Sequence, residues 1–222
     1  MALKYILFDL DGTLIDTSPG IKESLSKMKE ELSIDALDVN DINKFIGPPL
    51  AYSFGKYLKL KDKKLDQAIS VFRKYYTNGG QEKALVYSGM KEILEQLLKN
   101  EYILGVATLK LEEKAYQVLE HFNIKKYFNV ICGAEPMLKE ATKKDIILAA
   151  LNKMGNIEKE KAILIGDSIY DAMGAKEAQI NFMPVSYGFG MGDKQYEKIL
   201  KSSKFAVNKP DEIIEKIKNI IF

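Results

Sequence analysis

Residues 8–16 read FDLDGTLID and directly follow the apolar residues Tyr5-Ile6-Leu7. This stretch places two carboxylates, Asp9 and Asp11, at the end of what we interpret as a buried strand. Burying charge is unfavourable unless a partner nearby compensates for it. The stretch therefore predicts a turn, a metal-binding loop or a catalytic nucleophile, and the rest of the chain has to distinguish them.

A calcium loop does not fit the spacing, although Asp9, Asp11 and Thr13 fall at its first, third and fifth positions. The sixth position would be Leu14 instead of glycine, and the twelfth would be Gly20 instead of glutamate. A hairpin turn at Asp-Gly stays possible on this segment alone.

The composition is that of a soluble globular protein, with 46% hydrophobic and 29% charged residues among 222. The net charge of +2 is too small to predict binding to nucleic acid or to a membrane surface. No apolar stretch reaches the ~18–20 residues of a membrane span, and Asp9 and Asp11 interrupt any signal peptide. The one cysteine, Cys132, fits a reducing compartment. We expect a cytoplasmic protein.

Six short apolar runs are typical of parallel strands covered on both faces, because they are continuous rather than alternating. They are Tyr5–Phe8, Ile103–Ala107, Val130–Cys132, Ala162–Ile165, Phe182–Tyr187 and Phe205–Val207. Segments with helical periodicity lie between them. Alternating strands and helices predict an α/β fold with a doubly wound, Rossmann-like parallel sheet.

One interval, from about Thr17 to Lys83, contains only helical periods, separated by Gly and Pro. We interpret it as a helical domain (residues 17–83) inserted into an α/β core domain (residues 1–16 and 84–222). The alternative is a set of extra helices packed on the core.

Polar side chains stand at three of the predicted strand ends. Asp9 follows the first strand, Thr108 follows Ile103–Ala107, and Asp167 follows Ala162–Ile165. Ligands of open α/β sheets bind beyond the carboxyl ends of the strands, so these residues are expected to converge on one crevice. Each has a plainer interpretation, as a helix cap or a turn. The three together favour a functional site.

The whole set resembles the haloacid dehalogenase superfamily of phosphohydrolases. Residues 9–13 (DLDGT) match its first motif, Asp-x-Asp-x-Thr, Thr108 matches the second, and residues 166–171 (GDSIYD) match the fourth. Residues 45–50 (FIGPPL) and 187–190 (YGFG) are similar to segments of the phosphoglycolate phosphatase-like branch. The resemblance runs over nearly the full chain and implies that the helical insert is a C1-type cap.

The third motif is a lysine, and here three lysines precede a helix expected to begin near Asp145. No proline follows any of them, unlike many members of the branch. We assign Lys143, with Lys139 and Lys144 as alternatives. Leu109 also departs from the branch, because it replaces the small polar residue that commonly follows the threonine of the second motif.

The resemblance implies that Asp9 is the nucleophile that forms an aspartyl-phosphate and that Asp11 is the general acid and base. Lys143 would neutralise the nucleophile and the transferring oxygens, and Thr108 would hydrogen-bond one of those oxygens. Gly12 allows the tight turn that lets both carboxylates face the pocket.

Four aspartates beside a phosphate need cations, because each like-charge pair at ~4 Å costs roughly 4 kcal/mol at an effective dielectric of 20. Carboxylate ligands favour Mg²⁺ over a softer metal. The resemblance implies that Asp9 and Asp167 bind it by their carboxylates and Asp11 by its backbone carbonyl. Asp171 completes the acidic set, and we expect it mainly to orient Lys143.

We therefore predict a Mg²⁺-dependent phosphatase acting on a small phosphorylated metabolite such as phosphoglycolate, as a monomer or weak homodimer. The alternatives are a phosphotransferase or sugar-phosphate mutase, a nucleotidase or pyrophosphatase, and a non-catalytic phosphate-binding protein. Besides Thr108 and Leu109, the predicted substrate contacts are Gly12, Thr13, Gly47, Pro48 and Arg73, the last three from the insert.

Overall fold

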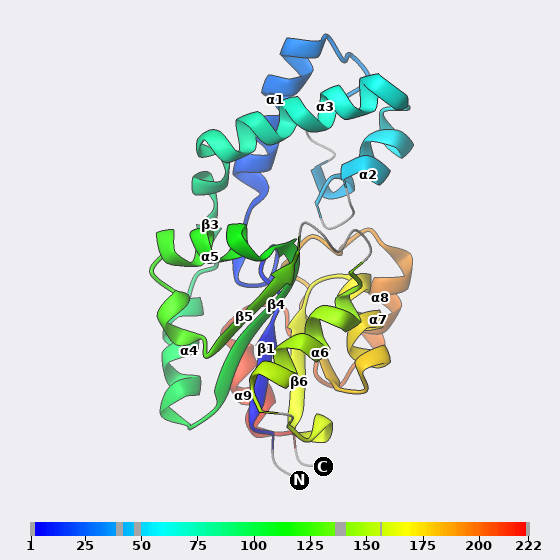
Figure 1. Cartoon of the computed structure of the whole chain (residues 1–222). Coiled ribbons are helices and arrows are strands. Elements are labelled where there is room, and N and C mark those ends of the chain that lie inside the picture. Colours follow the sequence, from blue (N-terminus) through cyan, green and yellow to red (C-terminus); the bar gives the residue numbers. More distant parts are fainter. Residues whose placement is uncertain (1–2, 39–41, 47–49, 136–140, 156, 221–222) are drawn as a thin grey trace. The chain divides into compact units, whose positions relative to one another are not determined.

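A sheet of five parallel strands lies at the centre of the larger of two compact units in the computed structural model (Figure 1). The structure describes residues 3–38, 42–46, 50–135, 141–155 and 157–220. The larger unit comprises Met1–Ile15 and Val86–Phe222, and the smaller comprises Asp16–Leu85.

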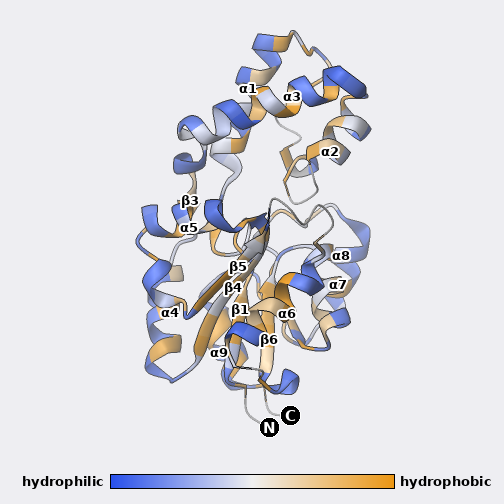
Figure 2. Cartoon of the chain, in the orientation of Figure 1, coloured by the Kyte–Doolittle hydropathy of each residue, from blue (hydrophilic) through white to orange (hydrophobic). Residues whose placement is uncertain are grey.

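The strand order in the sheet is β5-β4-β1-β6-β7, so the first strand is central. The strands are β1 (Tyr5–Phe8), β4 (Ile103–Leu111), β5 (Val130–Ala134), β6 (Ala162–Gly166) and β7 (Asn181–Pro184). Their apolar runs place hydrophobic residues throughout the sheet (Figure 2). The predicted α/β class with a parallel sheet is confirmed.

Helices cover both faces of this sheet. They are α4 (Met90–Lys99), α5 (Glu112–His121), α6 (Lys143–Lys153), α7 (Ile169–Ala178), α8 (Lys194–Ser202) and α9 (Glu212–Lys218). Helices α6 and α7 pack on one face, where Ile146, Ile147 and Ala175 join a core cluster with Leu7 and Leu164. Helices α4 and α9 lie on the other face (Figure 1). Short helical turns η4 (Lys125–Tyr127) and η5 (Lys159–Lys161) precede β5 and β6.

Several predicted strand boundaries differ from those observed. Strand β4 continues to Leu111, so Thr108 lies within it rather than beyond it, and β7 ends at Pro184 rather than Tyr187. The predicted strand at residues 205–207 is reduced to a single bridge between Val207 and Val185. Near this bridge, the backbone N–H groups of Phe205 and Asn208 donate to the side chains of Ser203 and Glu212 and not to a neighbouring strand.

The smaller unit is helical. It contains α1 (Ser18–Leu32), α2 (Leu50–Tyr57) and α3 (Asp62–Tyr75), with the short turns η1 (Ile42–Lys44), η2 (Tyr76–Gly80) and η3 (Gln81–Lys83). Its core is aromatic, with edge-to-face contacts of Phe54 with Phe45 and Phe72. Two short paired strands, β2 (Ile15–Asp16) and β3 (Leu85–Val86), occur where the chain passes between the units. In the part of the chain that the structure describes, no helix is both long and apolar enough to cross a membrane.

Candidate active site

Asp9 directly follows β1 at the carboxyl end of the sheet. Its backbone N–H donates to the carbonyl of Ile165 in β6 (2.9 Å), which extends the pairing of β1 with β6 by one residue. Asp9 is 8% exposed. Its Oδ1 accepts a hydrogen bond from Nζ of Lys143 at 2.5 Å. The structure thus places a nearly buried carboxylate, paired with an ammonium group, where β1 ends.

Lys143 is the first residue of α6, so the helix starts two residues earlier than predicted. The start is set by Thr142, which forms a capping box with Asp145. The helix dipole disfavours a cation at this position, and Lys143 is also buried. It is held by two carboxylates, because Nζ lies 2.5 Å from Oδ1 of Asp9 and 2.6 Å from Oδ1 of Asp171. Burial lowers the pKa of Lys143, but Asp171 and Asp9 together raise it above its ordinary value.

Asp171 lies in the first turn of α7 and is almost fully buried. Its Oδ2 accepts hydrogen bonds from the backbone N–H (3.0 Å) and the hydroxyl (2.6 Å) of Ser168, which caps the helix. Its Oδ1 contacts Lys143. Both oxygens are therefore engaged, and the carboxylate is fixed as a support for Lys143.

Asp167 follows β6 and is held by residues 187–190. The backbone N–H of Phe189 donates to its Oδ2 at 2.6 Å. The loop packs so closely that a methyl group at Gly188 would lie 2.3 Å from Cβ of Asp167. Gly12 also lies against Asp167. It has a φ of +87°, and a methyl group there would lie 2.2 Å from Oδ2 of Asp167. Because Gly12 and Gly188 have no side chain, the Asp167 side chain fits against their backbone atoms without a clash.

Asp9, Asp167 and Asp171 form a carboxylate cluster, in which one oxygen from each lies within 4.8 Å of the others. Burial raises the pKa of Asp9 to about 7, although Lys143 opposes the increase. Burial, with Asp171 and Asp9, also raises the pKa of Asp167 well above its usual range. One ammonium cannot neutralise three carboxylates, so the donor set fits a divalent cation that prefers oxygen ligands. Asp9 and Asp167 would be the better ligands for such a cation, because both oxygens of Asp171 are engaged.

The carboxylate of Asp11 has a different partner, Lys110. Nζ of Lys110 lies 3.1 Å from Oδ1 and 2.9 Å from Oδ2 of Asp11. Lys110 is not among the site residues predicted from the sequence. Its one signal in the sequence is that it lies two residues after Thr108. Its pairing with Asp11 does not follow from that spacing, because the strand is irregular between Ala107 and Leu111.

The other predicted residues of the larger unit have varied surroundings. Thr108 is 2% exposed, and its Oγ1 accepts a hydrogen bond from the backbone N–H of Lys110 at 3.2 Å. Leu109 packs against the core cluster beneath α6. The buried Oγ1 of Thr13 has no hydrogen-bond partner among the described residues.

The remaining predicted residues belong to the smaller unit, to α6 or to segments outside the part of the chain that the structure describes. Arg73 lies on the exposed side of α3, in the smaller unit. Gly47, Pro48 and Lys139 lie outside the described residues. Lys144 is half-buried in the first turn of α6, next to Lys143.

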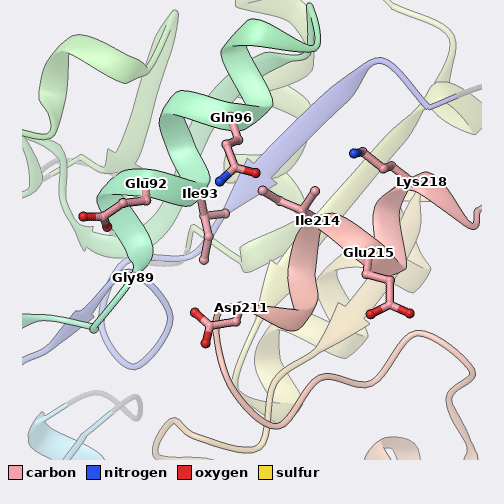
Figure 3. Close-up of a pocket in the computed structure, with 8 residues that line it drawn as sticks. All are labelled: Gly89, Glu92, Ile93, Gln96, Asp211, Ile214, Glu215 and Lys218. Atoms are coloured by element: carbon pink, nitrogen blue, oxygen red, sulfur yellow. The ribbon is translucent and has the colours of Figure 1, made fainter.

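A separate surface hollow of about 560 Å³ lies between α4 and α9 (Figure 3). It is lined by Gly89, Glu92, Ile93, Gln96, Asp211, Ile214, Glu215 and Lys218. It shares no residue with the carboxylate cluster.

Comparison with known proteins gives a consistent assignment. A family model described as haloacid dehalogenase-like hydrolase matches residues 6–185. The chain is similar to a 5'-nucleotidase of Pseudomonas aeruginosa (33% identity, 87% of this chain and 88% of the relative). It is also similar to a phosphoglycolate phosphatase of Aquifex aeolicus (29%, 99% of each) and a pyrophosphatase PpaX of Oceanobacillus iheyensis (30%, 100% and 96%). The crystal structure of a predicted phosphatase from Clostridium acetobutylicum superposes with a TM-score of 0.87 (35% identity, 99% and 100% covered).

Proposed function

The chain belongs to the haloacid dehalogenase-like hydrolase family, and we propose that it hydrolyses a small phosphate monoester with Mg²⁺, through a phosphoaspartate on Asp9. The observation that carries the proposal is the buried pair of Asp9 and Lys143, with Asp167 beside it. Three buried carboxylates around one ammonium group are unfavourable for folding alone, as the raised pKa values of Asp9 and Asp167 indicate, and such perturbed pKa values are typical of active sites.

The proposed reaction has two displacements at phosphorus. A carboxylate oxygen of Asp9 forms a bond to phosphorus as the bond to the ester oxygen breaks, and Asp11 gives a proton to the departing alkoxide. Water then attacks the phosphoaspartate, with Asp11 accepting its proton, and phosphate and Asp9 are released. Neither displacement needs an oxidant or any co-substrate other than water.

The surrounding residues prepare Asp9 for this role. Lys143 provides a positive charge beside the nucleophile, and Asp171 holds that lysine in place through its own bonds to Ser168. Asp9 and Asp167 would hold Mg²⁺. When bound, the ion favours the ionised carboxylates and withdraws negative charge from the phosphoryl oxygens. Thr108, buried in β4, is the proposed hydrogen-bond donor to a phosphoryl oxygen.

The proposed substrate is a small organic phosphate such as phosphoglycolate. The relatives named above differ in what they cleave from phosphate, so the phosphoryl-binding residues alone do not choose the leaving group. The helical unit, Asp16–Leu85, is the proposed cap over the substrate, and Arg73 is its candidate contact for an anionic group.

The test is release of inorganic phosphate from a panel of phosphate esters, with Mg²⁺ and with excess EDTA. The expected result is Mg²⁺-dependent release that is lost in EDTA. Undiminished phosphate release in EDTA would exclude a requirement for a metal ion. Transfer of the phosphoryl group to a second sugar phosphate, without free phosphate, would instead identify a mutase.

A further inference from the structure

Lys110 and Asp11 form an ion pair inside the proposed active site. The Lys110 ammonium is within 3.1 Å of both carboxylate oxygens, and the two side chains are only 10% and 22% exposed. The residues are far apart in sequence, on β4 and just after β1. The pair is therefore a feature of the tertiary structure.

A local irregularity in β4 precedes Lys110. Ala107 pairs with Cys132 and Leu111 pairs with Ala134, so residues 108–110 lie opposite Gly133 alone. Bulges of this kind occur next to active sites, where they redirect side chains. Within the bulge, Thr108 and Lys110 are joined by a hydrogen bond from the Lys110 backbone N–H. The same irregular segment thus carries the proposed phosphoryl ligand and the partner of Asp11.

The two lysines of the site have different relations to the proposed reaction. Lys143 already holds Asp9 and Asp171 as the chemistry requires. Lys110 occupies both oxygens of Asp11, whereas a general acid must turn an oxygen toward the ester oxygen of the substrate. Lys110 must therefore release at least one oxygen of Asp11 before Asp11 can act.

Separating a largely buried ammonium from its carboxylate is unfavourable unless another anion replaces it. A negatively charged group next to the ester oxygen would be such an anion. Resting on the proposed function, we propose that Lys110 determines specificity: it exchanges Asp11 for a negative charge on the leaving group. Phosphate monoesters whose leaving group carries a carboxylate or a second phosphate would thereby be preferred over uncharged ones. The exchange replaces one ion pair by another and makes or breaks no covalent bond.

The test compares phosphoglycolate with 2-hydroxyethyl phosphate, which has a neutral CH₂OH in place of the carboxylate at nearly the same size. For the wild-type enzyme, kcat/KM should be at least about tenfold higher for phosphoglycolate, the factor equivalent to ~1.4 kcal/mol. Lys110→Met should remove most of this preference, and Lys110→Arg should retain most of it. Lys126→Met, at an exposed lysine of η4, is the matched control and should leave the ratio unchanged.

Other outcomes overturn the inference in distinct ways. If kcat/KM for both esters fell together in Lys110→Met, Lys110 would only position Asp11. A wild-type enzyme that showed no preference for the charged ester, or that preferred the uncharged one, would also contradict it. In these cases the proposed phosphatase function stands. If the wild-type enzyme released no phosphate from any ester, the proposed function itself would fail. Thermal melting of each variant identifies any loss of fold.

Discussion

At the scale of single residues, Asp9 combines burial with a negative charge. Its pKa is raised to about 7 by burial, against the opposing effect of Lys143. Such a carboxylate is protonated more readily than an exposed one, and a bound cation would shift it to the ionised form. The proposed nucleophile is thus destabilised in the metal-free protein, as is typical of catalytic groups.

Asp9→Asn is expected to reduce turnover by roughly 10³-fold or more, because it removes the nucleophile. It also removes a buried charge from a crowded cluster, so the melting temperature of the metal-free variant should equal or exceed that of the wild type. Phosphate release and thermal melting measure the two effects. Near wild-type turnover would rule out the covalent mechanism.

Lys143→Met is expected to lower both the activity and the stability of the protein. It leaves Asp9 and Asp171 as uncompensated buried carboxylates. Removing one partner from a buried ion pair typically costs about 3–5 kcal/mol. Denaturant unfolding should show this loss together with loss of activity.

Lys144→Met is the matched control for Lys143→Met, because it removes a neighbouring lysine from the same turn of α6. It should change the free energy of unfolding by less than about 1 kcal/mol. A larger effect at Lys144 than at Lys143 would contradict the assignment of the third motif.

At the scale of elements, the site is assembled by the ends of strands and the first turns of helices. The capping boxes of α6 and α7 fix Lys143 and Asp171 at the same time as they start the helices. Residues 187–190 then hold Asp167 through a backbone N–H. Regular local structure therefore supplies the rigidity that the side chains of the site need.

Gly188→Ala is expected to weaken the proposed metal site without removing a proposed ligand, because its methyl group would lie 2.3 Å from Cβ of Asp167. The loop or Asp167 must then shift. We expect the Mg²⁺ concentration for half-maximal activity to rise at least about tenfold, as is typical when outer contacts of a metal ligand are lost.

The control is Gly55→Ala in α2, where a methyl group would have an ordinary contact of 3.7 Å. This variant should not change the Mg²⁺ dependence. An unchanged Mg²⁺ dependence in Gly188→Ala would show that the loop does not position Asp167.

At the scale of the whole molecule, the proposed metal binding would be linked to stability. A folded-state pKa of Asp9 above its unfolded value means that the native state binds this proton more tightly. The resulting stabilisation is complete below the unfolded pKa, near 4, and is lost as the pH rises toward 7. Since a metal ligand must be deprotonated, Mg²⁺ should bind more tightly as the pH rises through this range.

We therefore expect Mg²⁺ at about 100 times its Kd to raise the melting temperature near pH 8 by roughly 5 °C or more. The shift should be smaller at pH 5.5, and Asp167→Asn should largely lose it. Calorimetry with MgCl₂ and with NaCl at equal ionic strength measures it. A shift of equal size at both pH values would contradict the titration of Asp9.

Much of this architecture is predictable because it is local in sequence. Continuous apolar runs such as residues 162–165 predict buried strands, and the run of helical periods from Thr17 to Lys83 predicts the helical insert. Asp9 and Asp167 are found the same way, since each directly follows a strand and parallel strands end at one edge. The roles given to these residues, and the role of the helical unit as a cap, stay predictions.

What the sequence did not contain depends on contacts between distant residues. The pairing of Lys110 with Asp11 needs the register of β4 beside β1 and the bulge after Ala107, neither of which local periodicity encodes. Residues 205–207 have the composition of a strand, but only Val207 pairs with a neighbouring segment, through its bridge to Val185. Short-range patterns therefore determined the elements and their order, whereas long-range register and packing decided which charges meet.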